Sequence, residues 1–190
     1  MKLSTTLLAA AAAFTISTAT AQTSAPEGYT KASITLANGS IQTGYIKDNI
    51  KKSAEVVFVD ESGSNKKVYA GGDINGVKID AVNFICINGD FFKTICTGKL
   101  CFVQKASNAA GKASYNGTEA IISNGTEGKI GDYFIYADNK LKLINKKSVD
   151  GFINTDLAGC TAAAEKAKTI NGDMAKLQEA VEIYNSSSIK

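Results

Sequence analysis

The Asn-Gly dipeptide is the feature that most constrains how this chain of 190 residues folds. Both residues accept the positive φ angles of a tight turn, so Asn-Gly between runs of alternating apolar residues is the strongest local signal for a β-hairpin. The dipeptide occurs six times, beginning at Asn38, Asn75, Asn88, Asn116, Asn124 and Asn171. The sequence therefore predicts a mainly β protein.

Residues 31–80 are expected to form a first β subdomain. A two-residue turn at Asn38-Gly39 would place alternate side chains of its strands on one face, which we expect in the core. Those side chains are Ile34, Leu36, Ile41, Thr43 and Tyr45. Further strands are expected at 55–59, at 67–70 and after a helical turn at Asp73-Ile74-Asn75. Five short strands in meander order predict a small SH3-like barrel.

Residues 81–147 are expected to form an antiparallel β-meander with longer hairpins. The expected strands lie at 82–87, 91–96, 101–104, 133–136 and 141–144. In the last strand, Lys140 and Lys142 should face solvent, because they alternate with Leu141 and Leu143. Residues 105–118 are rich in Ala, Ser, Asn and Gly, which predicts an exposed loop.

The C-terminal segment, residues 148–190, changes from a period of two to the helical period of about 3.6. Two helices are predicted, at 156–169 and 173–184. An apolar stripe on the second helix is expected to pack on the sheet, and it consists of Met174, Leu177, Val181 and Tyr184. The predicted fold class is therefore α+β: mainly β, with an SH3-like barrel, an antiparallel meander and two C-terminal helices.

Residues 1–21 are typical of a signal peptide. Lys2 precedes an apolar run over 7–16, and the small-residue triplet Ala19-Thr20-Ala21 suits signal peptidase. The apolar run is about 10 residues, short of the roughly 20 that a transmembrane helix needs, and no later segment is long enough. We expect cleavage before Gln22, a flexible lead-in over 22–30, no membrane span in the mature chain, and a location in the periplasm or outside the cell.

The composition excludes several kinds of functional site. The chain contains no His and no Trp, and all 21 basic residues are Lys. Without imidazole, Ser-His-Asp catalysis, Cys-His catalysis and His-ligated zinc are excluded. Without Arg, bidentate recognition of phosphate or carboxylate by a guanidinium group is excluded too, which leaves the point charges of Lys. The net charge of +3 creates no strong field, so nucleic acid is not an expected partner, and no metal or cofactor is predicted.

The cysteines permit disulfides in an exported chain, and they are Cys86, Cys96, Cys101 and Cys160. A two-residue Gly98-Lys99 loop would place Cys96 opposite Cys101 at a separation that suits a disulfide. The Asn88-Gly89 turn would set Cys86 on the other sheet face, opposite Phe91. By elimination, Cys86 would pair with Cys160, or both would stay as buried thiols. The Cys96–Cys101 bridge is the favoured one.

Carboxylates give weaker catalytic hypotheses. Asp73-x-Asn75-Gly76 resembles part of a calcium loop, but Asp80 is misplaced for the distal ligand, so turn chemistry explains the motif better. Paired carboxylates for glycoside hydrolysis could come from Asp60, Glu61, Glu119, Glu127 and Asp132. A Ser-Lys dyad is also open, although no particular pair is indicated. Ordinary surface placement favours solvated loops for these groups.

Four sets of residues, spread over most of the chain, form a recognisable sequence pattern. They are Gly44-Tyr45-Ile46, Asp73-Ile74-x-Gly76, Phe91-Phe92, and a C-terminal set of Cys160, Leu177, Val181 and Tyr184-Asn185. This pattern resembles a group of secreted proteins of Bacteroidetes-type bacteria that have no assigned activity. The resemblance implies a setting in the bacterial envelope or outside the cell. The chain differs from that group in its additional hairpin cysteine pair.

The expected function is that of an exported, non-enzymatic binding or assembly protein of the bacterial envelope. A well-patterned scaffold is combined with a lack of catalytic groups, and exposed loops would contact an envelope or extracellular protein. The alternative is a secreted hydrolase that depends on carboxylates or on a Ser-Lys dyad. It predicts a concave pocket with convergent Asp, Glu or Lys side chains.

The signal peptide predicts the N-terminus of the processed protein. After expression in the native host and cell fractionation, the chain should be found outside the cytoplasm and should begin at Gln22, because signal peptidase cleaves after the small-residue triplet. Intact-mass spectrometry of each fraction measures this. A chain that keeps Met1 and stays in the cytosolic fraction would contradict export.

Overall fold

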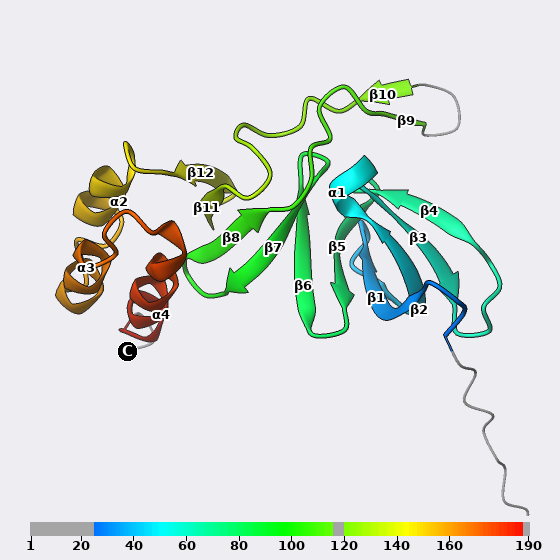
Figure 1. The fold of residues 1–190 in the computed structure, drawn as a ribbon, viewed down its shortest axis with the longest axis horizontal. Helices are drawn as coiled ribbons and strands as arrows, with labels where there is room; N and C mark the ends of the chain where they lie inside the picture. The colour runs from blue at the N-terminus through cyan, green and yellow to red at the C-terminus, as the bar shows by residue number, and fades with distance from the viewer. Residues whose placement is uncertain (1–24, 116–119, 188–190) are drawn as a thin grey trace, which may run out of the picture.

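The computed structural model describes residues 25–115 and 120–187 (Figure 1). The predicted signal peptide and the first part of the lead-in lie outside these residues. The strands are β1 (Thr30–Leu36), β2 (Ile41–Asn49), β3 (Glu55–Asp60), β4 (Lys67–Ala70), β5 (Ile74–Ile79), β6 (Val82–Ile87), β7 (Asp90–Cys96), β8 (Cys101–Lys105), β9 (Ala113–Tyr115), β10 (Ala120–Ile122), β11 (Tyr133–Ala137) and β12 (Lys140–Ile144). The helices are α1 (Ile50–Ser53), α2 (Val149–Thr155), α3 (Thr161–Lys168) and α4 (Leu177–Ser187), with a 3₁₀ turn η1 (Met174–Lys176).

Ten strands form one antiparallel sheet in the order β12-β11-β8-β7-β6-β5-β1-β2-β3-β4, and β9 and β10 form a separate hairpin. The predicted SH3-like barrel over 31–80 is wrong, because the sheet is open. Strand β5 pairs with β1 on one side and with β6 on the other, so it has no free edge with which to close a barrel. The predicted meander order of the first five strands is also wrong, since β5 lies beside β1 and not beside β4.

The first hairpin forms where the sequence predicts it, but in another register. A hydrogen bond from the Leu36 N–H to the Ser40 carbonyl closes a loop longer than two residues, and Thr35 pairs with Ile41. A shift of one residue exchanges the two faces of a strand. The predicted core face is therefore wrong for β2: Ile41 is 68% exposed, and Ile46 is buried instead.

The predicted helical turn at Asp73-Ile74-Asn75 is also wrong, because β5 begins at Ile74. Gly76 lies inside this strand, where a Cβ would be only 2.5 Å from the carbonyl oxygen of Phe84 in β6. Asn75-Gly76 thus marks a close contact between strands. Asn88-Gly89, in contrast, forms the predicted turn between β6 and β7, with both residues at positive φ.

The second half of the sheet follows the prediction closely. Strands β6, β7 and β8 form the expected antiparallel meander, and β11 and β12 form the expected hairpin around Asp138-Asn139. Lys140 and Lys142 of β12 are exposed, as their alternation with leucines predicts. Strand β11 joins the meander by pairing with β8.

The C-terminal helices cover one face of this half of the sheet (Figure 1). The prediction of two helices is wrong: α2 was not predicted, and the predicted helix at 156–169 begins only at Thr161, because a turn around Gly159, a poor helix former, separates α2 from α3. The apolar stripe of α4 packs on the sheet as expected: Leu177 and Val181 are fully buried in a core with Phe102 of β8. None of the helices among the described residues has the length and hydropathy needed to cross a membrane.

Asn185 fastens α4 to the β7–β8 hairpin. Its buried amide accepts a hydrogen bond from the Leu100 N–H and donates to the carbonyls of Leu100 and Thr97. In Asn185→Ala these buried backbone groups lose their partners, so the free energy of unfolding should fall by about 1–3 kcal/mol. Urea unfolding followed by circular dichroism measures the loss. Ser186→Ala, at an exposed position of the same helix, is the control and should change stability by less than about 0.5 kcal/mol; equal losses would contradict the role of Asn185.

Candidate functional site

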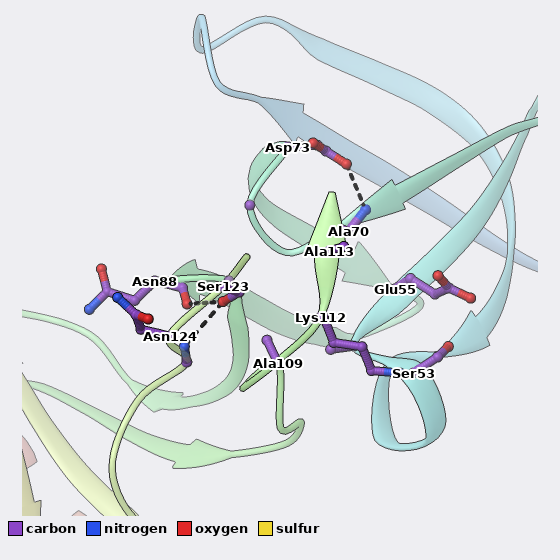
Figure 2. Close-up of a pocket in the computed structure, with 14 residues that line it drawn as sticks. Ser53, Glu55, Ala70, Asp73, Asn88, Ala109, Lys112, Ala113, Ser123 and Asn124 are labelled. Atoms are coloured by element: carbon purple, nitrogen blue, oxygen red, sulfur yellow. Dashed lines mark hydrogen bonds between the residues drawn. The ribbon is translucent and has the colours of Figure 1, made fainter. Parts of the chain in front are cut away.

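A cleft of about 710 Å³ opens between one end of the sheet and the segment that carries the β9–β10 hairpin (Figure 2). Ligand pockets are typically roughly 300–1,000 Å³, so the size fits a binding site. The end of α1, the start of β3 and the β4–β5 connection line one wall. The β6–β7 turn and residues 109–113 and 123–125 line the other. The cleft therefore joins segments that are far apart in the sequence.

A buried ion pair holds the second wall in place. Asp90 begins β7 and Lys105 ends β8, and both side chains are fully buried, with 3.1 Å between Asp90 Oδ2 and Lys105 Nζ. Asp90 also accepts hydrogen bonds from the Ser107 hydroxyl, from the Ala109 N–H, and from both the N–H and the hydroxyl of Thr126. One carboxylate thus binds the segment on both sides of the β9–β10 hairpin.

The Lys105 ammonium is equally well satisfied. It donates to the backbone carbonyls of Thr126, Glu127 and Gly128 at 2.7, 3.2 and 3.3 Å. Burial raises the pKa of Asp90, but the hydrogen bonds from Thr126 and from Lys105 outweigh this effect and hold the pKa below its ordinary 3.8. The carboxylate therefore stays charged inside the protein.

The predicted exposed loop over 105–118 is wrong in its first part. Lys105, Ser107 and Ala109 are buried, because each serves the Asp90 network or packs beneath it. Residues 116–118 of the predicted loop lie outside the described residues.

Three charged side chains line the cleft: Glu55 and Asp73 on the sheet wall, and Lys112 on the opposite wall. Among the described residues, none of the three belongs to an ion pair. Asp73 Oδ2 accepts a hydrogen bond from the Ala70 N–H at 2.9 Å, and Glu55 is the cross-strand partner of Ala70. The two carboxylates therefore flank the last residue of β4.

The two serines of the cleft make structural hydrogen bonds. Ser123 donates to the Asn88 carbonyl and accepts from the Gly125 N–H, each at 3.1 Å, and Ser53 donates to the Asn49 carbonyl. Within the described part of the chain, neither hydroxyl bonds to a lysine or a carboxylate. The cleft thus offers charges and hydrogen-bonding groups to a bound molecule, and it does not assemble a Ser-Lys nucleophile.

Of the carboxylates considered for glycoside hydrolysis, the four that the structure describes do not line this cleft. Asp60 ends β3 and Glu61 follows it in the β3–β4 turn, where hydrogen bonds from Ser62 and Asn65 lower the pKa of Asp60. Glu127 and Asp132 follow β10, and Glu119 lies outside the described residues. The described carboxylates that are close in sequence are therefore not gathered at this cleft.

The motif that resembles a calcium loop is divided by the fold. Asp73 lines the cleft, whereas Asn75 and Gly76 belong to β5, and Asp80 lies in the β5–β6 turn. No group of three or more Asp, Glu or Cys side chains in residues 25–115 and 120–187 could hold a metal ion.

The cysteines are all free thiols in the structure. Cys86 lies opposite Phe91 as predicted, but a bulge after Thr94 sets Cys96 opposite Phe102 and not opposite Cys101. The geometric premise of a Cys96–Cys101 bridge is therefore wrong: Cys96 borders the helix-covered core, and Cys101 borders the core on the other sheet face. For an oxidised chain the pairings remain predictions.

The thiols also differ in acidity. Burial raises the pKa of Cys86 and of Cys101, and it raises the pKa of Cys96 to about 11. The hydrogen bond from Ser187 lowers the pKa of the half-buried Cys160. Cys86 and Cys160, the less favoured pair, border different cores of the molecule.

No sequence pattern predicted Glu55 and Lys112 as cleft residues or the pairing of Asp90 with Lys105. One signal for Lys105 exists in the sequence. Alternation from the buried Val103 places Lys105 on the same inward face of β8, so a buried lysine was foreseeable, but its partner was not.

Comparison with known proteins finds no matching family model, no matching curated protein and no matching solved structure. The resemblance to secreted proteins of Bacteroidetes-type bacteria remains a prediction.

Lys105→Met tests the buried pair. Removal of one partner leaves the charge of Asp90 uncompensated in the interior, and the free energy of unfolding should fall by about 3–5 kcal/mol. Lys142→Met is the matched control, because Lys142 pairs with Asp156 on the surface and such pairs contribute about 0–1 kcal/mol. Urea unfolding of both variants measures the difference. Equal losses in the two variants would show that the buried pair contributes no more to the free energy of unfolding than the surface pair.

Proposed function

We propose that this chain is an exported, non-enzymatic binding protein of the bacterial envelope, and that the cleft is its binding site. The observation that carries the proposal is the set of cleft charges. Glu55, Asp73 and Lys112 line one hollow without ion-pair partners among the described residues, while the wall behind Lys112 rests on a fully satisfied buried ion pair. Free charges in a preformed cleft suit the capture of a polar partner.

The hydroxyl groups favour binding over hydrolysis. Ser53 and Ser123 are engaged with backbone groups, so neither is prepared as a nucleophile. Asp73 is held by the Ala70 N–H. The chain also has no His to act as a general base near neutral pH.

The lining also bears on the chemistry of the ligand. Small residues, amides and charges line the cleft, and none of its described lining residues is aromatic. Within the described part of the chain, the cleft therefore offers no ring for stacking on a sugar. The charges favour a ligand with a positive group near Glu55 and Asp73, and hydrogen-bonding groups elsewhere.

Site-specific photo-crosslinking in the native host tests this function. With a photo-reactive residue in place of Ala113, which lines the cleft, ultraviolet light should produce a discrete adduct with an envelope component. The same residue in place of Lys140, an exposed position at the far edge of the sheet, is the control and should produce none. Glu55→Lys should weaken the Ala113 adduct at least fivefold, because it reverses one of the free charges.

Two outcomes would overturn the proposal. Equal adducts from both positions, or no adduct at all, would remove the cleft as the binding site. Turnover of a peptide, ester or glycoside substrate that is lost in Glu55→Gln would instead make the protein the hydrolase that the sequence leaves as the alternative.

A further inference from the structure

We infer that the cleft binds an extended peptide segment of a partner protein by strand addition to β4, with a basic side chain of the peptide between Glu55 and Asp73. This inference rests on the proposed function and specifies its ligand. Strand β4 is the last strand of the ten-stranded sheet, and β10 is the one strand of the described residues that pairs with β9. Ala70 of β4 and Ala113 of β9 both line the cleft (Figure 2), so two strand edges border the same hollow.

The backbone of β4 offers a free position for pairing. The N–H of Ala70 donates to Asp73 Oδ2, and its carbonyl accepts from the Asp73 N–H, so both groups point away from β3. Backbone groups alternate in direction along an antiparallel strand, so the N–H and carbonyl of Val68 also point to the open edge. An incoming strand can therefore pair with Val68.

The exposed side chains of β4 are of two kinds: Lys67 at its start is a charge of the sort that protects a sheet edge, whereas Val68 beside it is apolar. Val68 is 49% exposed on β4, and Ile122 is 66% exposed on β10. At the opposite edge of the sheet, β12 exposes Lys140 and Lys142, charges that discourage pairing. An exposed apolar residue on an open edge strand fits recognition of an extended peptide, in which backbone hydrogen bonds give affinity.

The carboxylates supply the specificity. Asp73 bonds to the outward N–H of Ala70 on the open side of β4, and Glu55 is the cross-strand partner of Ala70 on the inner side. A long basic side chain of an added strand that extends over the small Ala70 would therefore lie between the two carboxylates. Neither carboxylate has an ionic partner among the described residues. A Lys or Arg of the added strand would complete the charge balance of this wall.

Binding of synthetic peptides tests the inference. The probes are two fluorescein-labelled libraries of ten-residue peptides with Val, Thr and Ser at the flanking positions, one with Lys and one with Glu fixed at the centre. Measured by fluorescence anisotropy with the full processed chain, the Lys library should bind at least tenfold more tightly than the Glu library. N-methylation of alternate backbone nitrogens in the Lys peptides should abolish binding, because it removes the pairing hydrogen bonds.

Protein variants separate the two parts of the inference. Glu55→Gln with Asp73→Asn should weaken binding of the Lys library about tenfold, while Glu27→Gln with Asp138→Asn removes the same charge at exposed positions elsewhere and should leave binding unchanged. Val68→Pro removes the outward N–H, and proline is tolerated at such an edge position, so it should abolish binding without loss of the fold. If Val68→Pro does not fold, the N-methylated peptides test the same hydrogen bonds.

Equal binding of the Lys and Glu libraries, or binding that N-methylation leaves intact, would overturn strand addition with basic specificity. A cleft-dependent photo-adduct in the host without peptide binding would also overturn strand addition, but it would leave the proposed binding function intact. Dimerisation of the chain that Val68→Pro abolishes, without peptide binding, would assign the β4 edge to a second copy. If neither the photo-adduct nor peptide binding is observed, both proposals are overturned.

Discussion

The buried pair of Asp90 and Lys105 is the interaction on which the arrangement of the cleft depends. Removing two charges from water costs several kcal/mol for each ion, and this pair offsets the cost with hydrogen bonds to the backbone and hydroxyls of residues 107–128. The same bonds fix a long connection that has little regular structure of its own. That connection carries one wall of the cleft, so the buried side chains of Asp90 and Lys105 determine where Lys112 lies.

The sheet also distributes its apolar side chains over separate cores. Phe91 and Phe92 are adjacent in β7 and fully buried, yet Phe91 packs with the N-terminal strands and Phe92 packs with Phe134 on the other face. A strand alternates its side chains between faces, so one strand can serve two cores. The helices then cover a third cluster around Phe102 and Phe152. Strands β7 and β8 are therefore the centre of the molecule, and both ends of the ion pair are attached to them.

Sequence signals of a few residues predicted the features that depend on local conformation, such as tight turns. Asn88-Gly89 and Asp138-Asn139 specify tight turns, so the hairpins around them were predictable. The place of β5 beside β1 depends on pairing between distant segments, which no periodicity encodes, and Asn75-Gly76 misled because the same dipeptide also permits the close approach of β6. The first hairpin failed by a single residue, which was enough to exchange Ile41 with Ile46. For the site, the sequence interpreted Asp73 as a turn residue, which agrees with its bond to the Ala70 N–H, but did not indicate that it lines a cleft. Lys105 was missed because its partners lie more than twenty residues further on or fifteen before it.

The contact of Gly71 with Gly89 limits which substitutions the protein can accept during evolution. The two residues form an isolated bridge beside the cleft, and a Cβ on Gly71 would lie 2.2 Å from the Gly89 carbonyl oxygen. Main chain therefore meets main chain at this point, and no side chain can be introduced there without separating the strands. The residues that carry charge stand on the surrounding walls, where substitution disturbs no such contact. A lineage of these proteins could exchange one ligand for another by altering the walls while the depth of the hollow stays the same.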